Sequence, residues 1–236
     1  EAEREASFFT TGGLAAVHSA GRDRNSIWEG LTNKETYGTS GDRILLWFDL
    51  IQNDSIFPMG SSTSLNKNPV FRVKAVGAFE QKPGCPDYSS TNITEEEIAR
   101  ICKNECYNPS DKRKNISRIE VVKITPQINP NEPVETLISD VWKSFECSPS
   151  QQGCEFEFID EDYEKESRDS IYYVRAIQEA SPVINAGNLR CTYNDEGECI
   201  KVNICYGDSR TDRDDDCLTL SEERAWSSPI YVNYNK

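Results

Sequence analysis

The sequence predicts an α+β fold in which a strand–helix unit is followed by a mainly antiparallel β-sandwich with disulfides. A short apolar run near the start leads through a polar loop into a segment with one apolar helical face. Later segments alternate apolar and polar residues, which is typical of strands with one wet face. Most of the nine cysteines lie in closely spaced pairs in the second half of the chain.

The strand–helix unit begins with Ala15–Ser19, a short apolar run of the kind that a fully buried parallel strand shows. The polar loop after it leads into a helix, for which Asp23 is the natural N-cap. The apolar positions that fall on one face of this helix are Ile27, Trp28 and Leu31. One strand and one helix cannot bury both faces alone, so we expect this unit to pack on something else.

The loop between this strand and this helix carries candidate site residues. In a β/α barrel, the loops after the C-terminal ends of the strands form the catalytic mouth. We therefore expect Ser19, Arg22 and Arg24 at such a mouth, where the arginines could hold an anionic substrate through bidentate hydrogen bonds. His18 is a candidate metal ligand. Each has a structural alternative: a hydrogen-bonded His18, and an Arg24 paired with a carboxylate on the helix surface.

The rest of the chain predicts the strands of the sandwich. A short helix is expected at Thr94–Asn104, because Thr94 suits the N-cap and acidic residues follow in the first turn. The proline-containing stretch 126–133 predicts an extended loop. The predicted strands are Arg43–Leu50, Val70–Phe79, Arg118–Ile124, Glu155–Ile159, Ser170–Gln178 and Pro229–Tyr234.

The cysteines predict local disulfides and therefore an oxidising compartment, secreted or periplasmic. Their spacings fit no common zinc pattern. Cys85 is expected to pair with Cys102 or Cys106, which leaves one free thiol. The local pairs expected are Cys147–Cys154, Cys191–Cys199 across a hairpin turn, and Cys205–Cys217.

The composition argues against two classes of partner. The chain has 40 acidic and 26 basic residues, a formal net charge of −14. Nucleic acids and anionic membrane surfaces are also negative and bind through clustered Lys and Arg, so neither partner is expected. No apolar run approaches the length of a membrane span, so membrane insertion is not expected either.

An acidic loop near the end of the chain predicts a possible calcium site. Asp212, Asp214 and Asp216 could supply the oxygen ligands that Ca²⁺ prefers. Their spacing matches neither an EF-hand nor a glycine-rich aspartate repeat. The alternative interpretation is a solvated run of charge.

Several segments carry a resemblance to a known family. The runs GGLAAVHSAGRDRNSIWEGL and ETYGTSGDRILLWFD, with IYYVRAIQE and ERAWSSPIYV downstream, resemble the C-terminal half of an uncharacterised bacterial family. That family is related to the PHP (polymerase and histidinol phosphatase) metal-dependent phosphoesterases. The resemblance implies that residues 1–41 are the last strand–helix unit of a distorted, PHP-like β/α barrel that needs a partner. It implies that residues 42–236 are the disulfide-stapled β-sandwich.

The resemblance also implies a function that this chain cannot perform alone. The family's His- and Asp-rich metal motifs are missing, and His18 is the only histidine, whereas catalytic zinc needs about three protein ligands. We therefore expect a C-terminal part of a metal-dependent hydrolase, inactive in isolation. The divalent metals would be held by the N-terminal half of the same precursor or by a partner polypeptide. The alternative is a non-catalytic extracellular structural or interaction protein.

Overall fold

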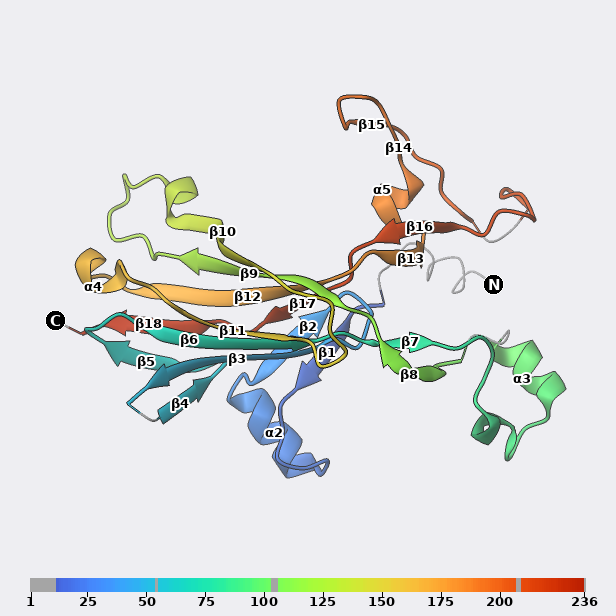
Figure 1. The fold of residues 1–236 in the computed structure, drawn as a ribbon, viewed down its shortest axis with the longest axis horizontal. Helices are drawn as coiled ribbons and strands as arrows, with labels where there is room; N and C mark the ends of the chain where they lie inside the picture. Colours follow the sequence, from blue (N-terminus) through green and yellow to red (C-terminus); the bar gives the residue numbers. More distant parts are fainter. Residues whose placement is uncertain (1–11, 54, 103–105, 207–208, 236) are drawn as a thin grey trace.

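Two mainly antiparallel sheets face each other around one hydrophobic core in the computed structural model, which describes residues 12–53, 55–102, 106–206 and 209–235 (Figure 1). The predicted sandwich is therefore confirmed. The larger sheet has eight strands. They are β1 (Leu14–Val17), β2 (Thr36–Thr39), β5 (Ser62–Leu65), β9 (Ile116–Ile124), β10 (Ile138–Glu146), β12 (Ser170–Gln178), β17 (Arg224–Ser227) and β18 (Ile230–Tyr234).

Strand β12 is the centre of the larger sheet. It pairs with β9 along its length, and with β17 and β18 one after the other. Strand β2 continues the sheet from β17, and β1 follows β2. All these pairs are antiparallel, whereas β18 pairs with β5 in parallel.

The smaller sheet has four strands in the order β11, β6, β3 and β4. Their bounds are Cys154–Ile159 for β11, Val70–Val76 for β6, Leu45–Gln52 for β3 and Ser55–Pro58 for β4. Alternate residues of β3 and β6 are buried, and they include Phe48 and Phe71. These rings stack with Phe158, and Phe71 also contacts Tyr172 of the larger sheet at 4.6 Å between centroids. The core thus joins the two inner faces.

Short elements extend from the sandwich (Figure 1). Three two-stranded antiparallel pairs lie outside the two main sheets: β7 (Phe79–Gln81) with β8 (Pro109–Arg113), β13 (Ser181–Ile184) with β16 (Leu218–Ser221), and β14 (Thr192–Tyr193) with β15 (Cys199–Lys201). The helices are α2 (Arg24–Thr32), α3 (Glu95–Cys102), α4 (Tyr163–Glu166) and α5 (Ala186–Arg190), and the 3-10 turns are Asp87–Ser90 and Val134–Leu137. No helix within the described ranges is long and apolar enough to span a membrane.

The predicted local signals are largely confirmed. Asp23 caps α2, since its carboxylate accepts from the backbone N–H groups of Asn25 and Ser26. Thr94 and Glu97 exchange hydrogen bonds at the start of α3, as in a capping box. Lys103 and Asn104, the last residues of the predicted helix, lie outside the described ranges.

The three local disulfides are present as predicted, and Cys85 pairs with Cys106 rather than Cys102. Cys147 follows β10 of the larger sheet, whereas Cys154 begins β11 of the smaller one. The Cys147–Cys154 bond therefore joins the two layers. Four disulfides are consistent with an oxidising compartment.

The first strand differs from its prediction. The sequence predicts a fully buried parallel strand, but β1 pairs antiparallel with β2, and Leu14 and Ala15 are exposed. The reason is topological, because the chain turns through α2 and returns directly alongside β1. Residues 12–41 thereby join the large sheet of the β-domain through β17. The described structure does not contain a barrel around them, and residues 1–11 lie outside the described ranges.

A buried charge network lies at one end of the sandwich. Lys123 and Asp160, 5% and 1% exposed, form an ion pair at 2.7 Å. Glu166 contacts the same ammonium at 2.6 Å, and the Tyr172 hydroxyl donates to Asp160 at 2.6 Å. Burial disfavours the charged ammonium, but the hydrogen bonds to the two carboxylates outweigh it and raise the pKa of Lys123. Burial, with the neighbouring Asp160, raises the pKa of Tyr172.

Candidate functional site

His18 lies at the end of β1 and links the two sheets. Its Nε2 atom is 2.8 Å from the carbonyl oxygen of Leu46 in β3, and its ring lies near the rings of Tyr37 and Trp47. Within the described ranges, no group of three His, Cys, Asp or Glu residues could hold a metal ion. The residues described here therefore do not form a metal site around His18. The observed geometry is that of the structural alternative, a hydrogen-bonded histidine.

The loop after His18 presents its polar side chains to solvent. Ser19 is used locally, since its hydroxyl donates to the carbonyl oxygen of Gly21 at 2.7 Å. Arg22 and Arg24 are exposed, and their side chains make no hydrogen bond or ion pair with any described residue. Arg24 does not pair on the helix surface, because Asp23 is engaged in the cap. The two guanidinium groups are thus available to an anion.

Helix α2 contacts the sheet through its smallest residue. Gly30 is the one buried residue of α2, and a Cβ atom there would collide with the His18 carbonyl oxygen and lie 2.7 Å from Val17 Cγ2. Because the helix contacts β1 through Gly30, its larger apolar residues do not lie in this contact. Trp28 is 69% exposed and Leu31 48% exposed. Exposed apolar side chains therefore lie on both elements, Trp28 and Leu31 on α2, and Leu14 and Ala15 on β1.

Strand β1 has one free edge in the described structure. It pairs only with β2, and the apolar residues Leu14 and Ala15 are exposed beside this edge. The backbone N–H of His18 donates to the Glu35 carbonyl oxygen, so the backbone groups of His18 point toward β2. In an antiparallel ladder the residues alternate, so the backbone groups of Ala15 and Val17 point toward the free edge. Natural proteins usually cover or blunt such an edge.

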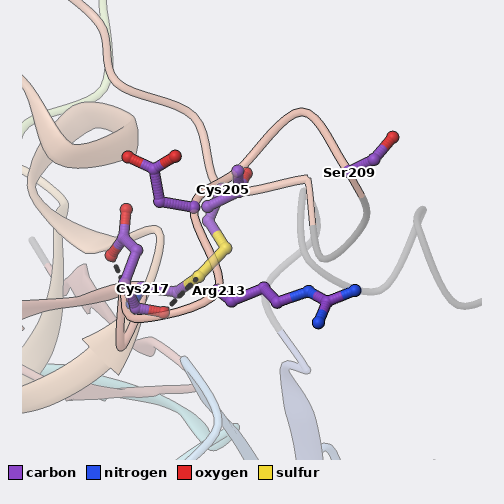
Figure 2. A pocket seen from close by; sticks show the side chains of 7 residues that line it. Cys205, Ser209, Arg213 and Cys217 are labelled. Atoms are coloured by element: carbon purple, nitrogen blue, oxygen red, sulfur yellow. Dashed lines mark hydrogen bonds between the residues drawn. A yellow bond between two sulfur atoms is a disulfide. The ribbon is translucent and has the colours of Figure 1, made fainter.

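The acidic loop lines a hollow of about 610 Å³ beside the Cys205–Cys217 disulfide (Figure 2). Arg213 extends away from the disulfide in this view. Asp215 pairs with Arg190 at 2.8 Å and accepts the Cys217 N–H, and both interactions lower the pKa of its carboxyl. The sequence did not single out Asp215 for this role, because its partner Arg190 lies in a different turn.

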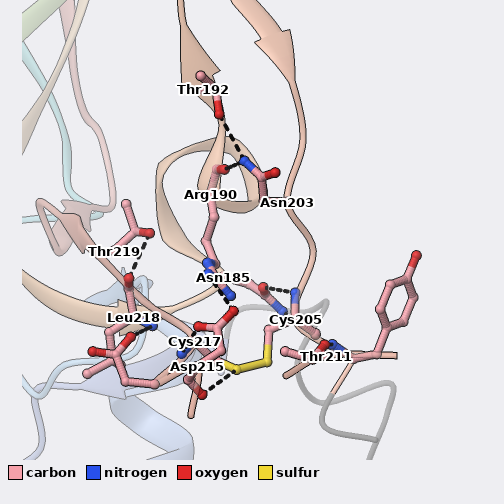
Figure 3. A network of polar contacts seen from close by, with 12 residues as sticks. Asn185, Arg190, Thr192, Asn203, Cys205, Thr211, Asp215, Cys217, Leu218 and Thr219 are labelled. Atoms are coloured by element: carbon pink, nitrogen blue, oxygen red, sulfur yellow. Dashed lines mark hydrogen bonds and ion pairs between the residues drawn. A yellow bond between two sulfur atoms is a disulfide. The ribbon is translucent and has the colours of Figure 1, made fainter. Parts of the chain in front are cut away.

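The three aspartates of the calcium hypothesis are not gathered into a metal site. Asp216 accepts the N–H of Leu218 at 3.0 Å, and Asp212 and Asp214 are exposed. The loop is held instead by hydrogen bonds and the disulfide (Figure 3). Asn185 exchanges two hydrogen bonds with the Cys205 backbone, at 2.7 and 2.9 Å. The observed contacts favour a loop that is anchored by its own polar network, with solvated carboxylates.

A second hollow, of about 350 Å³, lies on the outer face of the smaller sheet. Its lining residues come from three adjacent strands: Trp47, Asp49, Arg72, Lys74 and Glu155. Burial raises the pKa of Asp49, against the opposing effects of Arg72 and His18. The sequence analysis missed this group. The available signal was the alternation in β3 and β6, which sends an aromatic and three charged residues to one face.

The comparisons with known proteins concern the start of the chain. A family model described as "Protein of unknown function (DUF3604)" matches residues 1–49. No curated protein and no solved structure matches the chain. The matched range includes β1, α2 and β2, the elements that carry the exposed apolar surface and the two unpaired arginines.

Proposed function

We propose that this chain is the C-terminal part of a secreted or periplasmic PHP-like metal-dependent hydrolase of the phosphoesterase type. An N-terminal half, from the same precursor or a partner polypeptide, would complete the catalytic unit. The observation that supports this best is the exposure of apolar side chains on β1 and α2. The PHP assignment itself rests on the resemblance of the runs GGLAAVHSAGRDRNSIWEGL, ETYGTSGDRILLWFD, IYYVRAIQE and ERAWSSPIYV.

The exposed apolar side chains and the free edge of β1 could be covered by another chain segment. Burying a large apolar side chain such as Trp28 or Leu31 gains about 1.5–3 kcal/mol each. The free edge of β1 offers backbone donors and acceptors to a further strand, so apolar and main-chain contacts could form together. A strand added there would continue the sheet beyond β1. The strand–helix unit would then have neighbours on both sides, as the sequence analysis expects.

The loop residues fit an anionic substrate. Arg22 and Arg24 carry permanent positive charge and present forked donors that match phosphate oxygens. They lie at the end of β1, beside the surface that the N-terminal half would cover. The described residues do not supply a metal set, so the divalent metal ions would be bound by the N-terminal half. In that arrangement Arg24 binds the substrate and orients it.

The proposal is tested by joining this chain with the sequence encoded upstream of it. The measurement is turnover of bis(p-nitrophenyl) phosphate with added Mn²⁺, for the isolated chain and for the combined protein. We expect no turnover by the isolated chain and metal-dependent turnover by the combined protein. Arg24→Ala should lower turnover by about 10- to 100-fold, the value of a charge-assisted hydrogen bond in the transition state.

The matched control is Arg100→Ala, because Arg100 is exposed on α3, far from α2 in Figure 1. This variant should keep full turnover. Turnover by the isolated chain would contradict the proposal. An upstream half that neither binds this chain nor gains activity from it would favour the non-catalytic extracellular protein. Equal activity of wild type and Arg24→Ala would remove Arg24 from the site.

A further inference from the structure

We propose that the outer face of the smaller sheet binds a neutral sugar around Trp47. The strand register places side chains of this face in rows across β3, β6 and β11. One row is Trp47, Lys74 and Glu155, and the next contains Asp49 and Arg72. These five residues line the hollow of about 350 Å³. The site lies on the sandwich itself and is independent of the proposed hydrolase function.

Trp47 supplies a flat apolar surface in an otherwise polar site. Its side chain is 36% exposed on the wet face of β3, while its neighbours Leu46 and Phe48 point into the core. The His18 ring lies 5.8 Å from the Trp47 ring, and its contact with the Leu46 carbonyl fixes the position of His18. The indole is therefore supported from one side. A pyranose ring has an apolar face of C–H groups that stacks on such a surface.

The polar residues around Trp47 offer both donors and acceptors. Lys74 and Glu155 lie 3.4 Å apart, and Arg72 and Asp49 lie 3.5 Å apart. These are long contacts that leave most hydrogen-bonding positions free, since a carboxylate has about four and a guanidinium five. A sugar hydroxyl donates and accepts at once. The alternation of carboxylate and cation around the indole therefore suits a hydroxyl-rich ligand.

The charges favour a neutral ligand over an ionic one. The two carboxylates and two cations that line the hollow cancel, so neither an anion nor a cation gains a net local field. The chain as a whole carries a formal charge of −14, which repels anionic polysaccharides at long range. A neutral sugar pays no such penalty. It also keeps contact with both kinds of charged group.

The test is affinity electrophoresis of the isolated chain in gels that contain a soluble polysaccharide. The probes are hydroxyethylcellulose, arabinoxylan and galactomannan as neutral polymers, with polygalacturonate as the anionic one. We expect at least one neutral polymer to retard the wild-type chain. Trp47→Ala should weaken this binding by about tenfold or more, because it removes the stacking surface. Arg72→Met should weaken it by a smaller factor.

The matched control is Trp226→Ala, because Trp226 is 37% exposed on the other sheet, close to the 36% of Trp47. It should bind as wild type does. Circular dichroism checks that each variant is folded. If Trp47→Ala does not fold, Arg72→Met is used as the test variant in its place. No retardation by the neutral polymers, retardation by polygalacturonate alone, or unchanged binding by folded Trp47→Ala and Arg72→Met would each overturn the proposal. None of these outcomes bears on the phosphoesterase assay, which has its own readout and its own variant, Arg24→Ala.

Discussion

Lys123 shows how a single buried charge depends on its partners. Its ammonium lies between Asp160 and Glu166, and Asp160 also accepts from Tyr172. Replacing such a pair by apolar groups can be neutral, whereas removing one partner leaves an uncompensated charge. The buried ion pair is therefore a sensitive point of the fold.

We predict that Lys123→Met lowers the free energy of unfolding by about 3–5 kcal/mol, because Asp160 is left buried without its cation. Urea denaturation measures the loss, and Asp160→Asn in the same chain should restore part of it. The control is Lys74→Met, whose ion pair with Glu155 is nearly half exposed and contributes about 0–1 kcal/mol. Equal losses in the two variants would contradict the argument.

The pH dependence of this network follows from the direction of the pKa shift. The pKa of Lys123 is raised in the folded state. Its stabilisation is therefore fully present below the unfolded value of about 10.4, and it is lost as the pH rises through the folded value. Tyr172 acts in the same direction, because its neutral form is favoured in the folded protein. The network weakens in alkali.

At the scale of elements, helix α2 depends on Gly30. Alanine normally favours a helix over glycine by about 1 kcal/mol. At this position, however, the added methyl group would meet the His18 carbonyl oxygen and the Val17 side chain. The helix contacts β1 at the point where the side chain is missing, so the tertiary contact outweighs the helical preference.

We predict that Gly30→Ala destabilises the packing of α2 on β1 by about 1–3 kcal/mol, the usual cost of overpacking. Amide hydrogen exchange should show faster exchange in α2, with less change in β12. Gly12→Ala is the control, because no atom lies within 4 Å of a Cβ at that position. Slower exchange in the α2 of Gly30→Ala would mean that helical preference decides the outcome.

Local elements were more predictable than their pairing. Ser170–Gln178 was predicted with the bounds of β12, because its residues alternate between buried and half-buried over most of its length. Strand β10 was not predicted, since most of its residues are exposed and a register shift lies between Ser139 and Lys143. The antiparallel return of β2 onto β1 depends on contacts with β17, which no local pattern contains.

In the candidate sites, too, local contacts were more predictable than contacts between distant parts of the chain. Asp23 was predictable as a cap because its partners lie within three residues. The group around Trp47 comes from three strands that are separated along the chain, so its members could be identified one by one but not as a set. Likewise, the sequence showed that this loop is rich in aspartate. It did not show that Asp215 is the one that pairs with Arg190, because that contact depends on tertiary structure.

At the scale of the whole molecule, the disulfides differ in what they hold together. The Cys147–Cys154 bond joins the two sheets, whereas Cys191–Cys199 closes the small β14–β15 hairpin outside them. Their loops are similar, with sequence separations of 7 and 8. The two bonds therefore lower the entropy of the unfolded chain by nearly the same amount. If their removal changes stability differently, the difference arises in the folded state.

We predict that replacing Cys147 and Cys154 with alanine lowers the stability of the sandwich by about 2–3 kcal/mol. The same change at Cys191 and Cys199 should leave the main unfolding transition nearly unchanged, because the hairpin can open without the core. Calorimetry of both double variants measures the difference. Identical shifts of the main transition would show that the hairpin and the sandwich unfold as one unit.

The pairing of β5 with β18 can form only after both strands have been synthesised, which limits how early in translation the larger sheet can be completed. Asn233 contacts Ser62 across this pair, and the two residues are 171 positions apart. At about 5–20 residues per second, a ribosome needs on the order of ten to thirty seconds to make the intervening chain. During that interval β2 and β5 have been made, but β17 and β18, with which they pair, have not. This sheet would therefore remain incomplete in the nascent chain until β17 and β18 have been made, a state that is open to export machinery that threads polypeptides and to chaperones that shield them.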